Sequence, residues 1–127
     1  MIQALFSQPN YLGSKKLLDV TALRQEAIAS NLANAETPGY RRLDVAGTFQ
    51  SEFQRAMQSR DAGQVAGLQP KLELDPKAIS HRLDGNTVQM ETELAELQKN
   101  SLDHSLGTQL ITGSLLRLRL AITGRPA

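Results

Sequence analysis

The chain has 127 residues, a formal net charge of +1, 4% aromatic residues, and neither Trp nor Cys. This length suffices for one ordinary domain. The small net charge argues against a nucleic-acid or anionic-membrane surface, and without Cys there are no disulfides and no thiolate chemistry. Because large aromatic side chains usually supply much of a globular core, the composition favours long helices rich in Leu, Ala and Ile.

Two starts are open for the first helix. In one alternative Ile2, Leu5 and Phe6 form a short amphipathic turn; in the other Pro9 instead opens the first helix at its first position, with Gly13 inside that helix. We favour Ser14 as the N-cap, which gives a helix from about residue 15 to about residue 35. Its apolar stripe recurs at helical spacing and consists of Leu17, Thr21, Ile28, Leu32 and Ala35.

A corner follows this helix. Proline disfavours the α conformation of the residue before it, so Thr37 ends the helix, and Pro38-Gly39 fits the centre of a type II turn. Tyr40 is one of two Tyr residues and is expected to anchor the corner through its ring and hydroxyl.

This stretch resembles the N-terminal motif of the bacterial flagellar axial proteins, which reads approximately A-x-N-[IL]-A-N-x-x-T-P-G-Y. The matching residues are Ala29, Asn31, Leu32, Ala33, Asn34, Thr37, Pro38, Gly39 and Tyr40. The resemblance implies a structural subunit that leaves the cell through the flagellar type III channel. Such export fits a start that lacks the basic and apolar regions of a cleavable signal peptide.

The middle of the chain predicts little regular structure. Residues 41–47 should be extended or irregular, and residues 48–58 should form a short helix with Phe49 and Phe53 on one face. This face is expected to pack on a neighbour; alternatively, Phe-x-x-x-Phe resembles a segment with which rod and hook subunits engage the export gate. Residues 59–79 contain several Gly and Pro and predict a surface loop, with a brief strand at 72–74.

A second corner lies at residues 80–89. Asp84-Gly85-Asn86 is typical of a turn, and Asn86 with Gln89 suggests a capping box at the start of the last helix. Residues 84–88, with Met90 and Glu91, resemble the segment that opens the C-terminal helix of short proximal-rod members of the family. The chain lacks the large middle domains of hook and distal rod proteins.

The last helix should span residues 90–123. Steps of four and three predict a coiled-coil stripe made of Met90, Leu94, Leu97, Ser101, His104, Thr108, Ile111, Leu115, Leu118 and Ile122. A second row of leucines implies several neighbours at the C-terminal end. We interpret the polar middle of the stripe as a buried packing compromise rather than a metal site, because the only other His is His81.

These patterns predict an all-α fold: two long terminal helices packed antiparallel as a coiled-coil-like pair, with a short middle helix and a loop-rich middle. The expected segments are 1–47, 48–87 and 88–127. Phosphate loops, metal-ligand clusters and activated nucleophiles are missing from the sequence, so we expect no enzyme activity, no cofactor and no small-molecule substrate. Arg41-Arg42 is expected to be an interface or surface pair.

The resemblance implies a rod subunit of the basal body in the periplasm. Its implied partners are copies of itself, other rod proteins, the basal-body protein FliE with the inner-membrane ring, and the type III export gate. Its terminal helices would line the export channel and transmit torque. The alternative class is a soluble helical adaptor or export chaperone. The expected assembly interface comprises Ile28, Asn31, Leu32, Asn34, Pro38, Gly39, Tyr40, Met90, Leu94, Leu97, Ile111, Leu115, Leu118 and Ile122.

Overall fold

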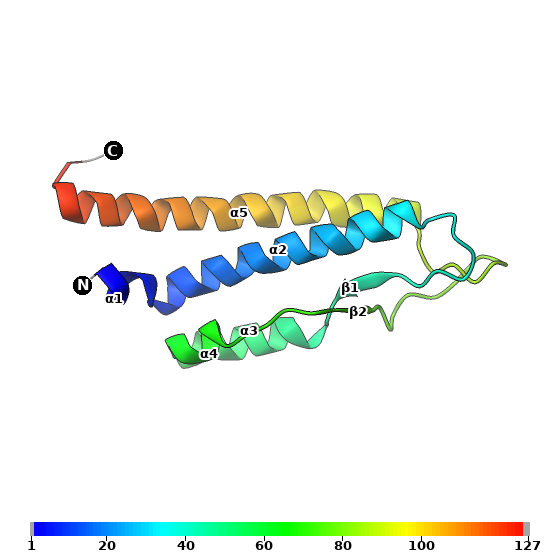
Figure 1. The fold of residues 1–127 in the computed structure, drawn as a ribbon, viewed down its shortest axis with the longest axis horizontal. Helices are drawn as coiled ribbons and strands as arrows, with labels where there is room; N and C mark the ends of the chain where they lie inside the picture. The colour runs from blue at the N-terminus through cyan, green and yellow to red at the C-terminus, as the bar shows by residue number, and fades with distance from the viewer. Residues whose placement is uncertain (1, 126–127) are drawn as a thin grey trace.

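Two long helices run side by side in opposite directions and give the molecule its length (Figure 1). They are α2 (Pro9–Ala33) and α5 (Met90–Thr123) in a computed structural model that describes residues 2–125. Contacts along the pair progress in opposite order, from Asn31 with Glu93 to Thr21 with His104. The predicted antiparallel pair of terminal helices is therefore confirmed.

The first long helix begins earlier than the favoured prediction. A short helix α1 (Ile2–Phe6) precedes it, and α2 starts at Pro9 with Gln8 as a cap residue that makes no side-chain cap bond. Ser14 lies inside the helix, where its hydroxyl donates to the carbonyl of Asn10 at 2.9 Å. The prediction of Ser14 as N-cap was wrong, because Pro9 already supplies the fixed φ of a first helical position.

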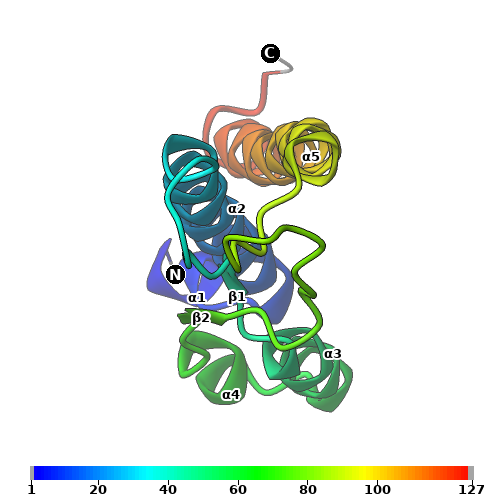
Figure 2. The same ribbon diagram turned by 90° about the vertical axis from the view of Figure 1, so that its right-hand side faces the viewer.

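The middle of the chain folds back along α2 on the side opposite α5, so the molecule has three layers with α2 in the centre (Figure 2). This layer contains the helices α3 (Thr48–Ser59) and α4 (Ala62–Ala66). It also contains the strands β1 (Leu43–Val45) and β2 (Leu72–Leu74), which pair antiparallel with Leu43 opposite Leu74. The brief strand at 72–74 was predicted, whereas α4 was missed because Gly63 and Gly67 suggested a loop.

A small core joins the middle layer to α2. Val20 of α2, Val45 of β1 and Phe49 of α3 are buried together. Phe53 stacks against Phe49 with ring centroids 5.9 Å apart, and Val65 of α4 is fully buried. The expected packing of the Phe49 and Phe53 face against a neighbour is thus met within the chain, by α2 and β1.

The contact between α2 and α5 is displaced by one residue from the predicted stripe. The buried residues of α5 are Glu93, Asn100 and Gly107, seven apart. A Cβ at Gly107 would lie 2.9 Å from Leu18 Cδ2, so any larger residue would force the Leu18 side chain to shift. The helices therefore meet along small and polar side chains, and four apolar residues of the predicted stripe stay exposed: Met90, Leu94, Leu115 and Ile122.

Candidate assembly site

The first corner has the geometry that its sequence predicts. Gly39 has a φ of 73°, in the left-handed region that glycine adopts without strain, and the Tyr40 amide donates to the Thr37 carbonyl at 3.3 Å. The Tyr40 hydroxyl lies 2.9 Å from Ser30 Oγ and donates to Asn31 Oδ1 at 3.3 Å. The hydroxyl therefore ties the corner to the last turns of α2.

Asn31 ties this corner to both long helices. Its side-chain amide donates to the Leu43 carbonyl at 2.8 Å and accepts from the Leu43 amide at 2.9 Å. A neighbouring strand would make the same two bonds with the backbone of Leu43. It also donates to Glu93 of α5 at 3.2 Å. Asn31 is fully buried, so its four bonds replace those that water would make.

Asn86 performs the matching role from the second corner. Its amide nitrogen donates to the carbonyls of Asn34, Ala35 and Thr37 at 2.8–3.1 Å. Its oxygen accepts from the Val88 amide at 2.8 Å. Asn86 therefore satisfies backbone carbonyls of the corner that follows α2, and the predicted capping box with Gln89 was wrong.

Arg42 and Glu93 form the buried centre of the site. Arg42 Nε donates to Glu93 Oε1, while its Nη1 donates to Asp75 at 2.7 Å and to Asp44 at 3.2 Å. Burial alone would lower the pKa of Arg42, but Glu93 and then Asp44 raise it above its ordinary value. Arg42 therefore stays charged and holds α5, β1 and the 75–79 loop together.

The sequence predicted that Arg41-Arg42 is an interface or surface pair. Arg41 is exposed, but Arg42 lies inside the chain with its side chain only 8% exposed, so the prediction was wrong for Arg42. Glu93 lies in the first turn of α5, where an acidic residue is favoured by the helix dipole even without a buried partner. The signal that could have found the pair is charge placement, since Arg42 and Glu93 each follow one of the two family-like motifs.

The predicted interface residues fall into three groups by exposure. Ile28 and Asn31 are buried within the chain. The half-buried residues are Leu32, Asn34, Tyr40, Leu97, Ile111 and Leu118, and the exposed residues are Pro38, Gly39, Met90, Leu94, Leu115 and Ile122. An apolar side chain that is exposed on a packed helix is available to another subunit, so the third group is the surface that this chain offers.

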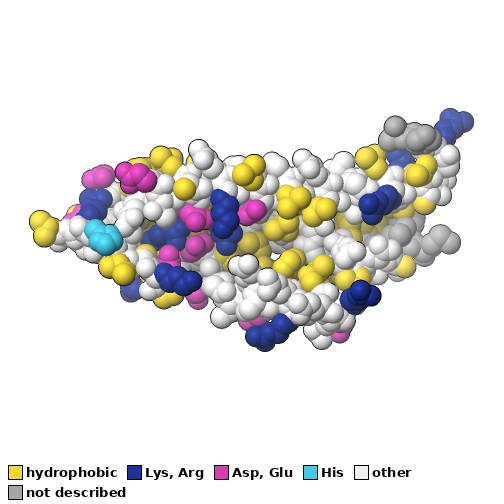
Figure 3. Space-filling view, turned by 180° about the vertical axis from the view of Figure 1, so that it is seen from behind, with side chains coloured by type: hydrophobic (Ala, Val, Ile, Leu, Met, Phe, Trp, Pro, Cys, Tyr) yellow, Lys and Arg dark blue, Asp and Glu magenta, His cyan; other side chains and the backbone are white. Residues whose placement is uncertain are grey.

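Further leucines of α5 enlarge this apolar surface, and the space-filling view shows separate apolar patches spread along the molecule (Figure 3). Leu102 is 72% exposed and Leu106 is 52% exposed. Leu110, Leu116 and Leu120 are each exposed by 44–46%. Exposed large apolar side chains gathered on one helix of a folded chain indicate an interaction site.

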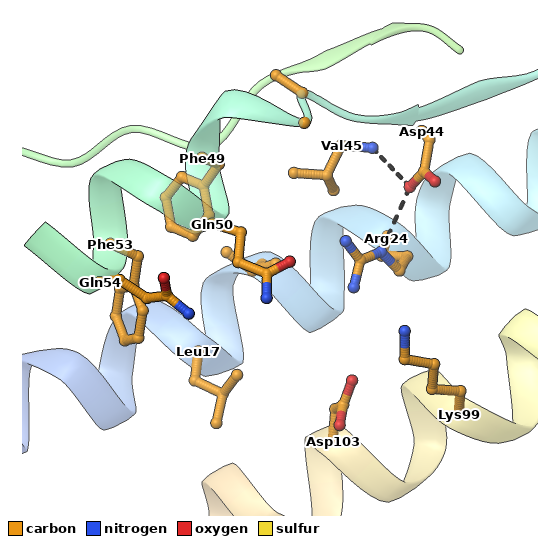
Figure 4. Close-up of a pocket in the computed structure, with 13 residues that line it drawn as sticks. Leu17, Arg24, Asp44, Val45, Phe49, Gln50, Phe53, Gln54, Lys99 and Asp103 are labelled. Carbon is orange, nitrogen blue, oxygen red and sulfur yellow. Dashed lines mark hydrogen bonds and ion pairs between the residues drawn. The ribbon is translucent and has the colours of Figure 1, made fainter. Parts of the chain in front are cut away.

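A groove of about 530 Å³ lies between α3 and α5, with α2 as its floor (Figure 4). Phe49 and Phe53 form its α3 wall, and Lys99 and Asp103 stand on the α5 side. Arg24 lies deeper and bonds Asp44 at 3.3 Å. The groove joins apolar walls to a charged rim, a combination that suits a protein segment more than a small substrate.

The polar middle of α5 is less buried than predicted. His104 Nδ1 lies 3.0 Å from Thr21 Oγ1 at the edge of the helix pair, whereas Ser101 and Thr108 are exposed and bond carbonyls of their own helix. Within residues 2–125, no three His, Cys, Asp or Glu residues are placed to hold a metal ion. Over the same residues, no helix is long and apolar enough to span a bilayer.

Fold and surface together define a class of protein. It is a subunit built on two long helices that are bonded to each other at one end, and its second helix carries apolar side chains that the rest of the chain leaves exposed. The family model described as flagella basal body rod protein matches residues 18–41. That stretch runs from the middle of α2 to the first corner.

Curated relatives match over most of their length. The flagellar basal body rod protein FlgB of Escherichia coli K12 is 35% identical over 117 residues, covering 80% of this chain and 83% of the relative. FlgB of Borrelia hermsii is 31% identical over 113 residues, covering 75% and 82%. FlgB of Salmonella typhimurium LT2 is 29% identical over 126 residues, covering 87% and 90%.

The chain belongs to the FlgB family of flagellar basal-body rod proteins. It is a structural component of the rod and not an enzyme. Membership in this family favours assembly with other basal-body components over the alternative of a soluble adaptor or export chaperone.

Proposed function

We propose that this chain is a subunit of the proximal rod, exported through the flagellar type III system and built into the rod in the periplasm by its terminal helices. The observation that carries the proposal is the exposure of Leu94 (48%), Leu115 (43%) and Ile122 (66%) on a helix already paired with α2. Burying a leucine of this kind contributes about 1.5–3 kcal/mol, so neighbours on several sides of α5 stabilise the subunit.

The transmission of torque requires a subunit whose two helices move together. The ion pair of Arg42 with Glu93 and the bonds of Asn31 join α2, β1 and α5 at one end of the molecule. Packed copies of such a unit pass load from helix to helix and line the export channel with the helix faces left between contacts.

Export uses the chain before the middle layer forms. Phe49 is only 8% exposed in the fold and stacks on Phe53. A gate that binds Phe-x-x-x-Phe through its rings therefore engages an unfolded chain. Folding of α3 against α2 after export buries the motif so that the gate can no longer bind it. Movement of the chain out of the cell is therefore favoured over its return.

The partners follow from the family and the exposed surface: copies of this chain, other rod proteins, FliE and the inner-membrane ring. A photo-crosslinking amino acid in place of Leu94 or Leu115 tests them in purified basal bodies. We expect crosslinks to basal-body components from both positions and none from Ile79, which is 69% exposed in the 75–79 loop. Basal bodies that lack the chain, in cells that still swim, would overturn the proposal.

A further inference from the structure

The strand β2 has an outer edge that faces away from its partner strand. The Asp75 amide donates to the Arg42 carbonyl across the sheet at 2.9 Å, and Leu43 lies opposite Leu74 in the next pair. Bonded and non-bonded pairs alternate along an antiparallel ladder. The backbone amides and carbonyls of Leu74, and of Leu72 two residues before it, therefore point away from β1.

The two outer edges of this small sheet differ in their hydrogen bonding. On β1, the amide and the carbonyl of Leu43 point away from β2, and both bond the side chain of Asn31. On β2, the outward amides and carbonyls of Leu72 and Leu74 make no hydrogen bond to any residue from 2 to 125. The helix α2 therefore closes one edge of the sheet, whereas the other edge keeps donors and acceptors for a further strand.

Prolines limit the length of this open edge. Pro70 precedes Leu72 by two residues, and Pro76 follows Leu74 by two residues. Proline has no N–H to donate, so the edge cannot extend its pairing beyond residues 72–74 on either side. Proline and charge are among the means by which proteins prevent non-specific pairing at strand edges. The edge therefore suits one short strand rather than an open-ended stack of strands.

The side chains of β2 define what such a strand must carry. Successive side chains point to opposite faces of a strand, so Leu72 and Leu74 share one face and Glu73 lies on the other. Leu72 packs against the buried core, and Leu74 beside it is 44% exposed. Glu73 is exposed and forms no ion pair within the part of the chain that the structure describes. A strand with a central Lys or Arg between two apolar residues would cover Leu74 and pair with Glu73.

The β2 strand of a second copy does not meet these requirements. Antiparallel pairing centred on Glu73 places two carboxylates directly opposite each other, in the closely spaced non-bonded pair where like charges are destabilising. A shift of the register by two residues places Pro70 opposite Leu74, or Pro76 opposite Leu72, and each proline leaves a carbonyl without its donor. Charge and proline placement therefore favour a basic strand from another protein over a second copy.

We propose that β2 binds an extended segment of another protein by β-strand addition, and that this segment has the pattern apolar–basic–apolar with its basic residue opposite Glu73. In an antiparallel arrangement, the two apolar residues exchange backbone hydrogen bonds with Leu72 and Leu74. Main-chain bonds then supply affinity and the alternating side chains supply specificity. The proposal does not depend on the position of the chain in the rod, because the edge belongs to the middle layer and not to α5.

Amide NMR of the full chain, titrated with the acetylated peptide Thr-Val-Lys-Val-Thr, tests the site. We expect the amides of Leu72 and Leu74 to become protected from hydrogen exchange, while the amide of Glu73, which faces β1, changes little. The same peptide with both valine amides N-methylated keeps its side chains but loses its donors, so its binding should be lost. Leu74→Pro removes an outward donor without removing a bond to β1 and should also abolish binding, whereas the control Leu74→Val should bind the peptide.

Exchange of charges tests the assigned partner chemistry. Glutamate in place of the peptide's lysine should weaken binding about fivefold, and the Glu73→Lys chain should prefer the glutamate peptide. Glu52→Lys makes the same change at an exposed position of α3 and should behave like the parent. Equal affinity of the parent chain for both peptides would overturn the basic partner.

Strand addition itself has separate tests. It would be overturned if millimolar peptide gave Leu72 and Leu74 no protection, or if the N-methylated peptide bound as well as the unmodified one. Protection of these amides that rises with the concentration of the chain alone would assign the edge to a second copy and overturn the proposal. Normal incorporation of the chain into basal bodies, with any of these results, would leave the proposed function standing.

Discussion

Arg42 and Glu93 are 51 residues apart in the sequence and form an ion pair whose side chains are 8% and 0% exposed. One follows the first corner and the other begins the last helix, so the bond fixes how the two ends of the chain meet. A buried ion pair adds little stability compared with an apolar pair of similar volume, but removing one partner leaves an uncompensated charge. The main effect of this pair is therefore to fix the position of the first corner relative to the start of α5.

Glu93→Gln should destabilise the fold strongly. The substitution keeps the shape of the side chain but removes the charge that faces Arg42, and we expect the free energy of unfolding to fall by about 3 kcal/mol. Urea denaturation followed by circular dichroism measures the change.

Glu91→Gln is the matched control for this change, because Glu91 is exposed in the same helical turn and should lose only a few tenths of a kcal/mol. Arg42→Met combined with Glu93→Leu should recover part of the loss. A Glu93→Gln protein as stable as the parent would show that the ion pair does not hold the corner.

Asn86→Asp tests the bond between the two corners. The amide nitrogen of Asn86 faces three carbonyl oxygens, and an aspartate oxygen in its place would be repelled by all three. We expect a loss of about 1–3 kcal/mol or more, since a buried charged group would be left unpaired. Thermal unfolding provides the measurement.

Gln89→Glu makes the same amide-to-carboxylate change at an exposed position before α5. It should be neutral or slightly stabilising, because a negative charge is favourable at a helix N-terminus. Equal melting temperatures for the two variants would contradict the role assigned to Asn86.

The sequence predicted the elements that depend on local rules. Pro38-Gly39 defined a turn, and the periodic apolar residues defined two long helices. It failed where the deciding interaction is distant in the chain, because Asp75 and Glu93, which surround Arg42, lie 33 and 51 residues away from it. It also failed in choosing the paired face of α5, since Gly107 and Asn100 carry no apolar signal although they allow the helices to approach closely.

A pair of glycine substitutions tests this close approach. Gly107→Ala places a methyl group 2.9 Å from Leu18 Cδ2, and overpacking of this kind costs about 1–3 kcal/mol. Gly113→Ala meets nothing within 4 Å and should stabilise the helix by up to about 1 kcal/mol. Chemical denaturation should therefore show a lower free energy of unfolding for Gly107→Ala and a higher one for Gly113→Ala. Changes of the same sign in both variants would contradict the packing of α5 on α2.

The export motif can be separated from the core that contains it. Phe49→Leu and Phe53→Leu keep an apolar side chain, so each should cost only about 1–2 kcal/mol in the fold. If the gate binds the rings, the amount of chain exported should nevertheless fall severalfold relative to the amount in the cell. Phe6→Leu is the control, because Phe6 is exposed outside this core; equal export of all three variants would exclude the motif.

Leu115→Asp tests whether α5 joins the rod through its exposed side. Leu115 is 43% exposed, so the single chain should fold nearly normally. A carboxylate buried between subunits would lose its hydration without gaining a compensating partner, so assembly should be disfavoured. We expect normal amounts of protein, loss of the chain from purified basal bodies, and loss of swimming. Leu115→Met has a similar volume and should be tolerated. If Leu115→Asp entered basal bodies as well as the parent, this side of α5 would not lie at a contact between rod subunits.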